Sequence, residues 1–293
     1  MAEYVWLLFA LASALAVGVY HVVNRYIMKR YSAYAYTLLL NFFGGLWALP
    51  FIFSNATFPT TTIPWVLAII SACIWAVAMV IAALSYRHLR VSRREPISQT
   101  EVVFVLLLSV LFLGERITWD KLVGTGLVLI GFLLLTVTKS QAALSHWKSK
   151  GVMLTLAAAF LYALGTIIDK YVIAFFSASI YVCILYLLTA VVLLPFLPKH
   201  FGAVHKLMVE RWWVVIAAAG LSMVTYYTAL RAMQLVDVST AYPVFKLGTL
   251  ITVGLGMVFF REERVYIMRK LAAAVLVILG GVLIAGATLW PLS

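Results

Sequence analysis

The sequence has little charge and almost no cysteine. Only 11% of its 293 residues are charged, whereas soluble domains average about 25%. Hydrophobic residues make up 65%, and the mean hydropathy is +1.06. This balance excludes a soluble globular domain. The two cysteines, Cys73 and Cys183, lie inside apolar runs, so we expect small buried side chains, neither a disulfide nor a metal site.

Recognisable catalytic motifs are also missing. The sequence has no nucleotide-binding glycine loop, nucleophile elbow or HExxH motif. The histidines are scattered at 21, 88, 146, 200 and 205. A membrane-embedded enzyme acting on lipid-linked substrates, the main alternative to a transport protein, would gather acids, histidines or metal ligands at one membrane face. We therefore expect a protein that is not an enzyme and that needs no cofactor.

The apolar residues fall into ten runs, most of them near the roughly 20 residues that a membrane helix needs. Because only Glu3 precedes the first run, a basic signal-peptide region is missing, and we expect that run to be a retained span. We predict an all-α integral membrane protein with ten transmembrane helices, some of them ended by Pro50, Pro195 and Pro198. The expected spans are 4–28, 33–53, 64–86, 96–113, 119–138, 151–174, 178–197, 212–233, 238–260 and 266–288.

The second half of the chain repeats the first. Residues 168–172 repeat 23–27 at an offset of 145, and residues 194–196 repeat 49–51 at the same offset. Five spans per repeat is an odd number, so the second repeat must enter the membrane in the opposite sense. We predict two inverted five-helix repeats, 1–140 and 150–290, in a single membrane domain, with the solute site at their interface.

The formal charge of +12 indicates topology. With both termini on one side, that side holds four Lys and Arg residues and the other holds sixteen. Basic loops face the cytoplasm, so we expect a multi-pass protein of the plasma or inner membrane with both termini outside. The charges are spread over short loops, which argues against a nucleic-acid partner.

Polar residues in the first and sixth spans are candidates for a solute site. His21, Asn24 and Arg25 share one helix face, and Asp169 and Lys170 lie on the matching face of the other repeat. Ionisable residues inside spans usually face a cavity, so we expect the two faces to meet near the pseudo-two-fold axis. Alternatively, Arg25 and Lys170 reach the membrane interface, and Asp169 neutralises one of them.

The fourth and ninth spans supply the remaining candidates. Lys246 lies in an apolar stretch, and by the repeat it corresponds to Gln99. We predict that Gln99, Glu101, Lys246 and, as a second choice, Tyr242 contact the solute, with Lys246 binding an anionic group or taking part in proton coupling. The alternative is a structural ion pair between Glu101 and Lys246. Aromatic residues that could also line the cavity are Trp75, Tyr162 and Tyr227.

Glycines in the fifth and tenth spans permit close helix contact. They are Gly124, Gly126, Gly131, Gly280, Gly281 and Gly286. If these glycines serve packing within the bundle, the protein can be a monomer. The alternative is that they form the interface of a homodimer through these two spans.

The segment Leu111-Phe112-Leu113-Gly114-Glu115-Arg116, its echo between residues 259 and 281, and Ala83-Leu84-Ser85-Tyr86 resemble the drug/metabolite transporter superfamily, EamA-type branch. The resemblance implies that spans 1–4 and 6–9 surround a central cavity while spans 5 and 10 lie at the periphery. Members move small metabolites, often by exchange or with protons. We interpret Glu115 and Glu263 as helix caps or interface contacts, not solute ligands.

We therefore predict a secondary transporter that moves a small polar solute across the lipid bilayer by alternating access. An anionic or zwitterionic solute is favoured over a neutral one, because basic groups outnumber acids in the spans. A channel is a further alternative, but it would need a continuous polar stripe through several spans.

Overall fold

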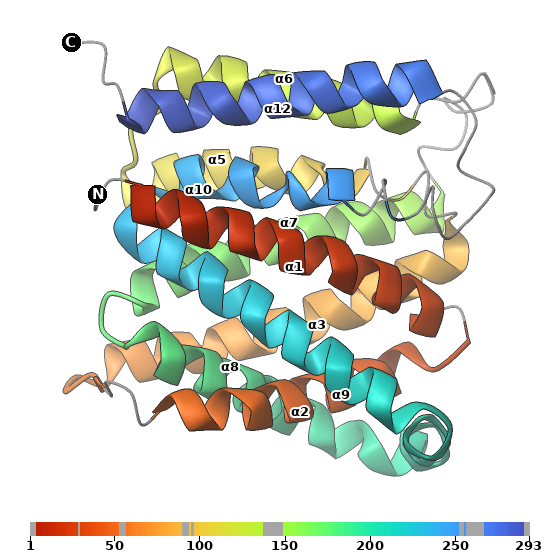
Figure 1. Cartoon of the computed structure of the whole chain (residues 1–293). Helices are drawn as coiled ribbons and strands as arrows, with labels where there is room; N and C mark the ends of the chain where they lie inside the picture. The colour runs from red at the N-terminus through yellow and green to blue at the C-terminus, as the bar shows by residue number, and fades with distance from the viewer. Residues whose placement is uncertain are drawn as a thin grey trace.

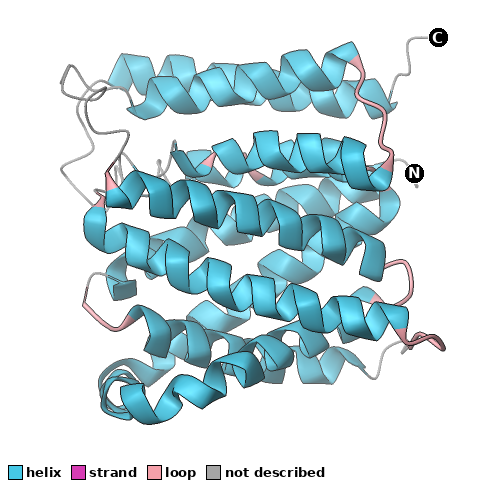
Figure 2. Ribbon diagram, turned by 180° about the vertical axis from the view of Figure 1, so that it is seen from behind, coloured by secondary structure: helices cyan, strands magenta, loops and turns pink. Residues whose placement is uncertain are grey.

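The structure is a computed structural model that describes residues 4–28, 30–52, 57–89, 94, 97–136, 149–251, 255 and 267–289. Within these ranges the regular structure is helical throughout, with no strand (Figures 1 and 2). The main helices are α1 Val5–Met28, α2 Ala33–Ile52, α3 Ile63–His88, α5 Thr100–Leu113, α6 Trp119–Thr136, α7 Lys150–Val172, α8 Ala178–Leu193, α9 Leu197–Leu235, α10 Val238–Phe245 and α12 Ile267–Leu289.

Five apolar helical stretches are long enough to cross a membrane. They are Val5–Met28, Ala33–Ile52, Ile63–Ser85, Lys150–Val172 and the continuous stretch Ala178–Leu235, and two shorter apolar helices cover Thr100–Leu113 and Ala272–Ala285. Most predicted bounds agree with the helices to within a few residues. Pro195 follows the end of α8 at Leu193, as predicted, whereas the other two prolines behave differently. Pro50 lies inside α2, and Pro198 lies in the first turn of α9, where a missing N–H is harmless.

The connection 198–211, which we expected to be a loop, is helical. It forms the first part of α9, and the helix breaks only at Arg211, where φ is −145° and ψ is 27°. Leu207 is fully buried in a cluster with Ile27, Leu39 and other apolar residues of the first half. This apolar contact gives the segment a buried face. The sequence did not indicate this face because the segment carries several basic residues.

The ninth span is not one continuous helix over its described part. Helix α10 ends at Phe245, and the chain then turns through Lys246 and Leu247. Pro243 lies inside α10 and has no N–H to donate. The next residues form hydrogen bonds to the carbonyl three residues earlier instead of four, from Leu247 N to Val244 O (3.1 Å) and from Thr249 N to Lys246 O (2.9 Å). The break therefore falls at Lys246.

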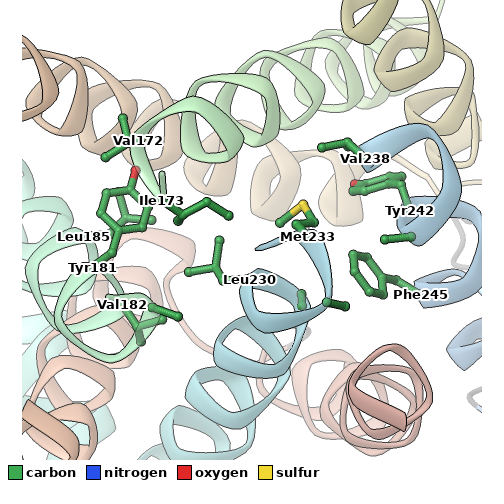
Figure 3. Packing of buried hydrophobic residues seen from close by; sticks show 14 of the residues in the cluster. Val172, Ile173, Tyr181, Val182, Leu185, Leu230, Met233, Val238, Tyr242 and Phe245 are labelled. Atoms are coloured by element: carbon green, nitrogen blue, oxygen red, sulfur yellow. The ribbon is translucent and has the colours of Figure 1, made fainter. Parts of the chain in front are cut away.

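Helices of the two halves interleave. Helix α1 packs against α9, α2 against α8, α3 against α7, α5 against α7 and α10, and α6 against α12. Figure 1 shows α6 and α12 side by side at one edge of the bundle, as the family resemblance implied, and α2 and α8 towards the opposite edge. The largest apolar cluster lies between the halves and includes Val172, Leu230 and Val238 (Figure 3).

Glycines set the distance between α6 and α12. A Cβ atom on Gly124 would lie 2.7 Å from the carbonyl oxygen of Gly280, and one on Gly280 would lie 2.4 Å from that of Gly124. These two glycines therefore pack against each other within one chain. A Cβ atom on Gly126, two residues along, would meet nothing within 4 Å. Cys183 is buried as expected, but Cys73 is exposed on α3, which corrects the prediction for that residue.

Replacing Gly124 by leucine should destabilise the protein, because a side chain there forces α6 away from α12. Overpacking of this kind costs about 1–3 kcal/mol, and a clash with backbone leaves little room to relax. Gly126→Leu is the matched control on the same helix. Thermal unfolding in detergent should give a lower Tm for Gly124→Leu than for Gly126→Leu, and equal values would contradict this packing.

Candidate functional site

A cavity of about 240 Å³ lies between the two halves. Its wall is formed by α1, α2, α3, α7, α8, α9 and α10, together with Arg94, Ser98, Gln99, Glu101, Lys246 and Thr249. None of the described side chains of α6 or α12 lines it. Six tyrosines and eight serine or threonine residues line the wall, which is therefore rich in hydroxyl groups and aromatic faces.

Glu101 and Lys246 form an ion pair at the cavity wall. The ammonium of Lys246 donates to Glu101 Oε2 at 2.9 Å and lies 5.0 Å from the ring centre of Tyr242. The Tyr242 hydroxyl donates to the other oxygen, Oε1. All three residues line the cavity. The side chain of Lys246 keeps 21% exposure and that of Glu101 keeps 9%. The ion pair links α5 to the break after α10 and also borders the cavity.

Gln99 lines the same cavity with an unused acceptor. Its Nε2 donates to Thr249 Oγ1 at 3.4 Å, while its Oε1 is buried and makes no hydrogen bond. Buried polar atoms without a partner are rare in folded proteins. The free carbonyl of Gln99 is thus a site where a donor group of a solute could bind.

Asn24 and His21 also line the cavity, from α1. The Asn24 side-chain carbonyl accepts from the hydroxyl of Tyr36 on α2. Nearby, the hydroxyls of Tyr186 and Ser222 bond to each other at 2.7 Å. Arg25 lies in α1, but its side chain is outside the described part of the structure. Of the three residues predicted in the first span, His21 and Asn24 therefore line the cavity.

Asp169 lies behind the cavity wall and not in it. Its residue is 0% exposed. Four neutral donors surround its carboxylate: Ser71 and Tyr181 on Oδ1, and Trp75, at 2.8 Å, and Tyr226 on Oδ2. Trp75 and Tyr226 are themselves cavity residues. Asp169 thus holds two aromatic rings of the wall in position.

Lys170 is not among the cavity residues. Its ammonium donates to the carbonyls of Met233 and, at 2.9 Å, Val236, which are left without partners at the end of α9. The expectation that the polar faces of the first and sixth spans meet is wrong, because α1 packs chiefly against α9 and α7 against α3. Among the described side chains, no Lys or Arg forms an ion pair with Asp169.

The end of the bundle beyond Met233 is closed by polar contacts between the halves. Glu115 accepts from the backbone N–H groups of Val238 (2.7 Å) and Ser239 (2.9 Å). Lys121 donates to Asp237 at 2.8 Å. Glu115 is therefore a helix cap, as predicted, but it caps α10 of the other half. Its repeat counterpart, Glu263, lies outside the described residues.

Several cavity residues were missed by the sequence reasoning. Arg94, counted as a loop charge, is buried and donates to Ser85 at 2.7 Å. Tyr20 and Ser13 extend the face of α1 that carries Asn24, and helical spacing from Asn24 could have found them. Trp75 and Tyr162 do line the cavity, but Tyr227 does not and stacks on Phe51.

An all-helical apolar bundle with helices long enough to cross a membrane, and with a polar cavity between its halves, is typical of a membrane transport protein. The sequence profile of the EamA-like transporter family matches residues 4–137 and 149–286. The chain belongs to the EamA-like transporter family, which agrees with its resemblance to the drug/metabolite transporter superfamily. It is an integral multi-pass membrane protein and a transporter.

Similar proteins are known from two Listeria species. "Putative sugar uptake protein lin0215" of Listeria innocua serovar 6a is 24% identical over 246 residues, covering 80% of this chain and 82% of that protein. The similarly named lmo0176 of Listeria monocytogenes serovar 1/2a is 25% identical over 249 residues, with the same coverage. A crystal structure described only as that of a protein shares the fold, with a TM-score of 0.69 at 12% identity, over 100% of this chain and 99% of that one.

Proposed function

We propose that the protein is a secondary transporter that carries a small, neutral, hydroxyl-rich solute, such as a monosaccharide, by alternating access. The observation that carries this proposal is the lining of the cavity. The cation of Lys246 is neutralised by Glu101 at 2.9 Å, the guanidinium of Arg94 donates to Ser85, and most other polar groups are uncharged hydroxyls and amides. Aromatic faces such as that of Trp75 suit the apolar face of a sugar ring.

The sequence-based preference for an anionic or zwitterionic solute loses support at two positions. Lys170 is engaged by the end of α9, and Lys246 is engaged by Glu101. The names of the two Listeria relatives refer to sugar uptake, which favours the neutral class. A membrane-embedded enzyme would need a reactive cluster, and the polar groups at this cavity are instead spread around its wall.

An inverted-repeat architecture of ten spans would support alternating access. Helix α1 packs on α9 as α7 packs on α3, and these two pairs would exchange under a two-fold axis relating the two halves. Asn24 accepts from Tyr36, twelve residues on, and Asp169 accepts from Tyr181, also twelve residues on. Such repeats are thought to rock around a central site.

The described residues that line the cavity lie towards one end of the bundle. Its wall includes Met28 at the end of α1 and Thr155 near the start of α7, on the side of the basic loops. The contacts of Glu115 and Lys121 close the opposite end. If both termini face outside, as the charge bias predicts, this arrangement would be open to the cytoplasm and closed to the exterior.

The test is uptake into proteoliposomes of the full-length protein with radiolabelled D-glucose, D-ribose, glucose 6-phosphate and glycine. We expect saturable uptake of at least one neutral sugar, and the same sugar should raise the Tm of the purified protein by mass action. Uptake of glucose 6-phosphate or glycine alone would restore the anionic or zwitterionic class. No flux of any probe above empty liposomes would contradict the proposed solute.

A further inference from the structure

The carboxyl of Asp169 is the one acidic group of the described cavity region that lacks a cationic partner. Glu101 lies 2.9 Å from the ammonium of Lys246. Asp169 instead contacts only neutral donors, from Ser71 and Trp75 on α3, Tyr181 on α8 and Tyr226 on α9. Ionisable groups buried inside spans are costly, and many of them act as proton relays in transporters.

The surroundings of Asp169 can accept either protonation state. Ser71, Tyr181 and Tyr226 each carry a hydroxyl, which can donate or accept. When Asp169 is ionised, all four neighbours donate to it. When one oxygen gains a proton, the new O–H donates to one hydroxyl, which turns its own proton elsewhere. Only one hydrogen bond reverses, so the apolar packing around Tyr181, seen beside Val172, Ile173 and Leu185 in Figure 3, can stay in place.

The repeat supplies an internal comparison. Asn24 occupies the matching place in the first half and accepts from Tyr36 as Asp169 accepts from Tyr181. An amide carbonyl fills this place without titrating, so the fold tolerates a neutral side chain there. A carboxyl in the second half adds one property, the ability to bind a proton.

We propose that Asp169 is the proton-binding site that couples proton movement to solute movement, an inference that rests on the proposed transport function. In the present state Asp169 is 0% exposed, and the hydroxyl of Tyr226 connects it to the cavity. On this side the proton leaves in a relay. Tyr226 gives its hydroxyl proton to cavity water and takes the proton of Asp169, which leaves a carboxylate and a neutral tyrosine. In the opposite state, water at the other end of the bundle returns a proton to the carboxylate.

Other titratable groups near Asp169 are already engaged. Tyr181 and Tyr226 face it from α8 and α9, while the α3 neighbours, Ser71 and Trp75, do not titrate in the ordinary range. Next to it on α7, Lys170 donates to carbonyls of α9. On α5, Glu101 binds Tyr242 and Lys246. A proton on Glu101 would leave the ammonium of Lys246 without its counter-charge, which disfavours that residue as the carrier.

Infrared titration of the purified full-length protein tests proton binding without any solute. All ten acidic residues absorb as carboxylic acids when they protonate, so the readout is the wild-type spectrum minus the variant spectrum. We expect a carboxylic C=O component that grows as the pH falls, that is lost in Asp169→Asn and that persists in Glu101→Gln. Tyr226→Phe keeps the carboxyl and should keep the band. No difference in titrating absorption between the folded wild type and Asp169→Asn, or a component lost in Glu101→Gln and retained in Asp169→Asn, would overturn the assignment.

Proteoliposomes with a trapped pH-sensitive dye test the coupling, with D-glucose as the probe. In the wild type, we expect a glucose gradient to drive proton movement. Asp169→Asn should lose this proton movement and glucose accumulation but retain glucose counterflow, and Tyr226→Phe should slow both proton and glucose movement. Saturable glucose flux without proton movement in the wild type would overturn the coupling. If glucose does not move at all, the proposed sugar fails, and the infrared band alone decides the proton site.

Discussion

Replacing Lys246 by alanine should abolish uptake while leaving expression intact. Loss of a hydrogen bond from a charged group to the solute costs about 1.5–3 kcal/mol, roughly ten- to a hundred-fold in affinity. The substitution also leaves Glu101, 7% exposed, with only the Tyr242 hydroxyl as a partner. Removing one partner of a buried pair costs about 3–5 kcal/mol, and less here because the Lys246 side chain is 21% exposed to the cavity. Both the Tm and the flux should therefore fall.

A double-substitution cycle separates the two roles of the pair. Lys246→Met and Glu101→Gln each leave one charge uncompensated, so each should lower the Tm, while the double variant should recover most of it. If the pair binds solute, flux stays lost in the double variant. Restored flux in the double variant would mean that the ion pair only holds α5 against the break after α10.

Filling the cavity should stop transport without unfolding the protein. Ala158 lines the cavity and is 1% exposed, so an indole ring at this position would occupy much of a space of about 240 Å³. Ala158→Trp should reduce sugar uptake to the level of empty liposomes and remove the solute-dependent rise in Tm.

Ala157→Trp is the matched control for this substitution. Ala157 is the neighbouring residue on α7 and is exposed on the outside of the bundle, where the ring would face lipid. Its uptake should match that of the wild type, and both variants should elute as single peaks from a sizing column. Unchanged uptake in a folded Ala158→Trp protein would remove this cavity from the transport path.

The helices could be predicted because the membrane leaves the chain few choices. Backbone groups in lipid must bond within their own helix, so apolar runs such as 33–53 and 151–174 became helices within a few residues of the predicted bounds. The predicted helix bounds were wrong where tertiary contacts or a proline outweighed the local hydropathy pattern. Leu207 gave the expected loop a buried apolar face, and Pro243 with the following turn interrupted the ninth span.

The cavity was predicted only in part, because side-chain direction depends on the helix opposite. Sequence spacing identified His21, Asn24, Gln99, Glu101, Tyr242 and Lys246, which all line the cavity. It could not distinguish Asp169 from Lys170, which are adjacent on α7. One is enclosed by α3, α8 and α9, and the other caps the end of α9.

The sequence by itself determined that this is a membrane-embedded helical protein with a repeated half, because hydropathy and internal similarity are properties of the chain alone. Only the tertiary structure decided which charges are compensated. Glu101 and Lys246 are 145 residues apart and meet at 2.9 Å, whereas Asp169 meets no described cation. Whether a buried charge is available to a solute or a proton depends on its neighbours in space, and packing between the two halves sets those neighbours.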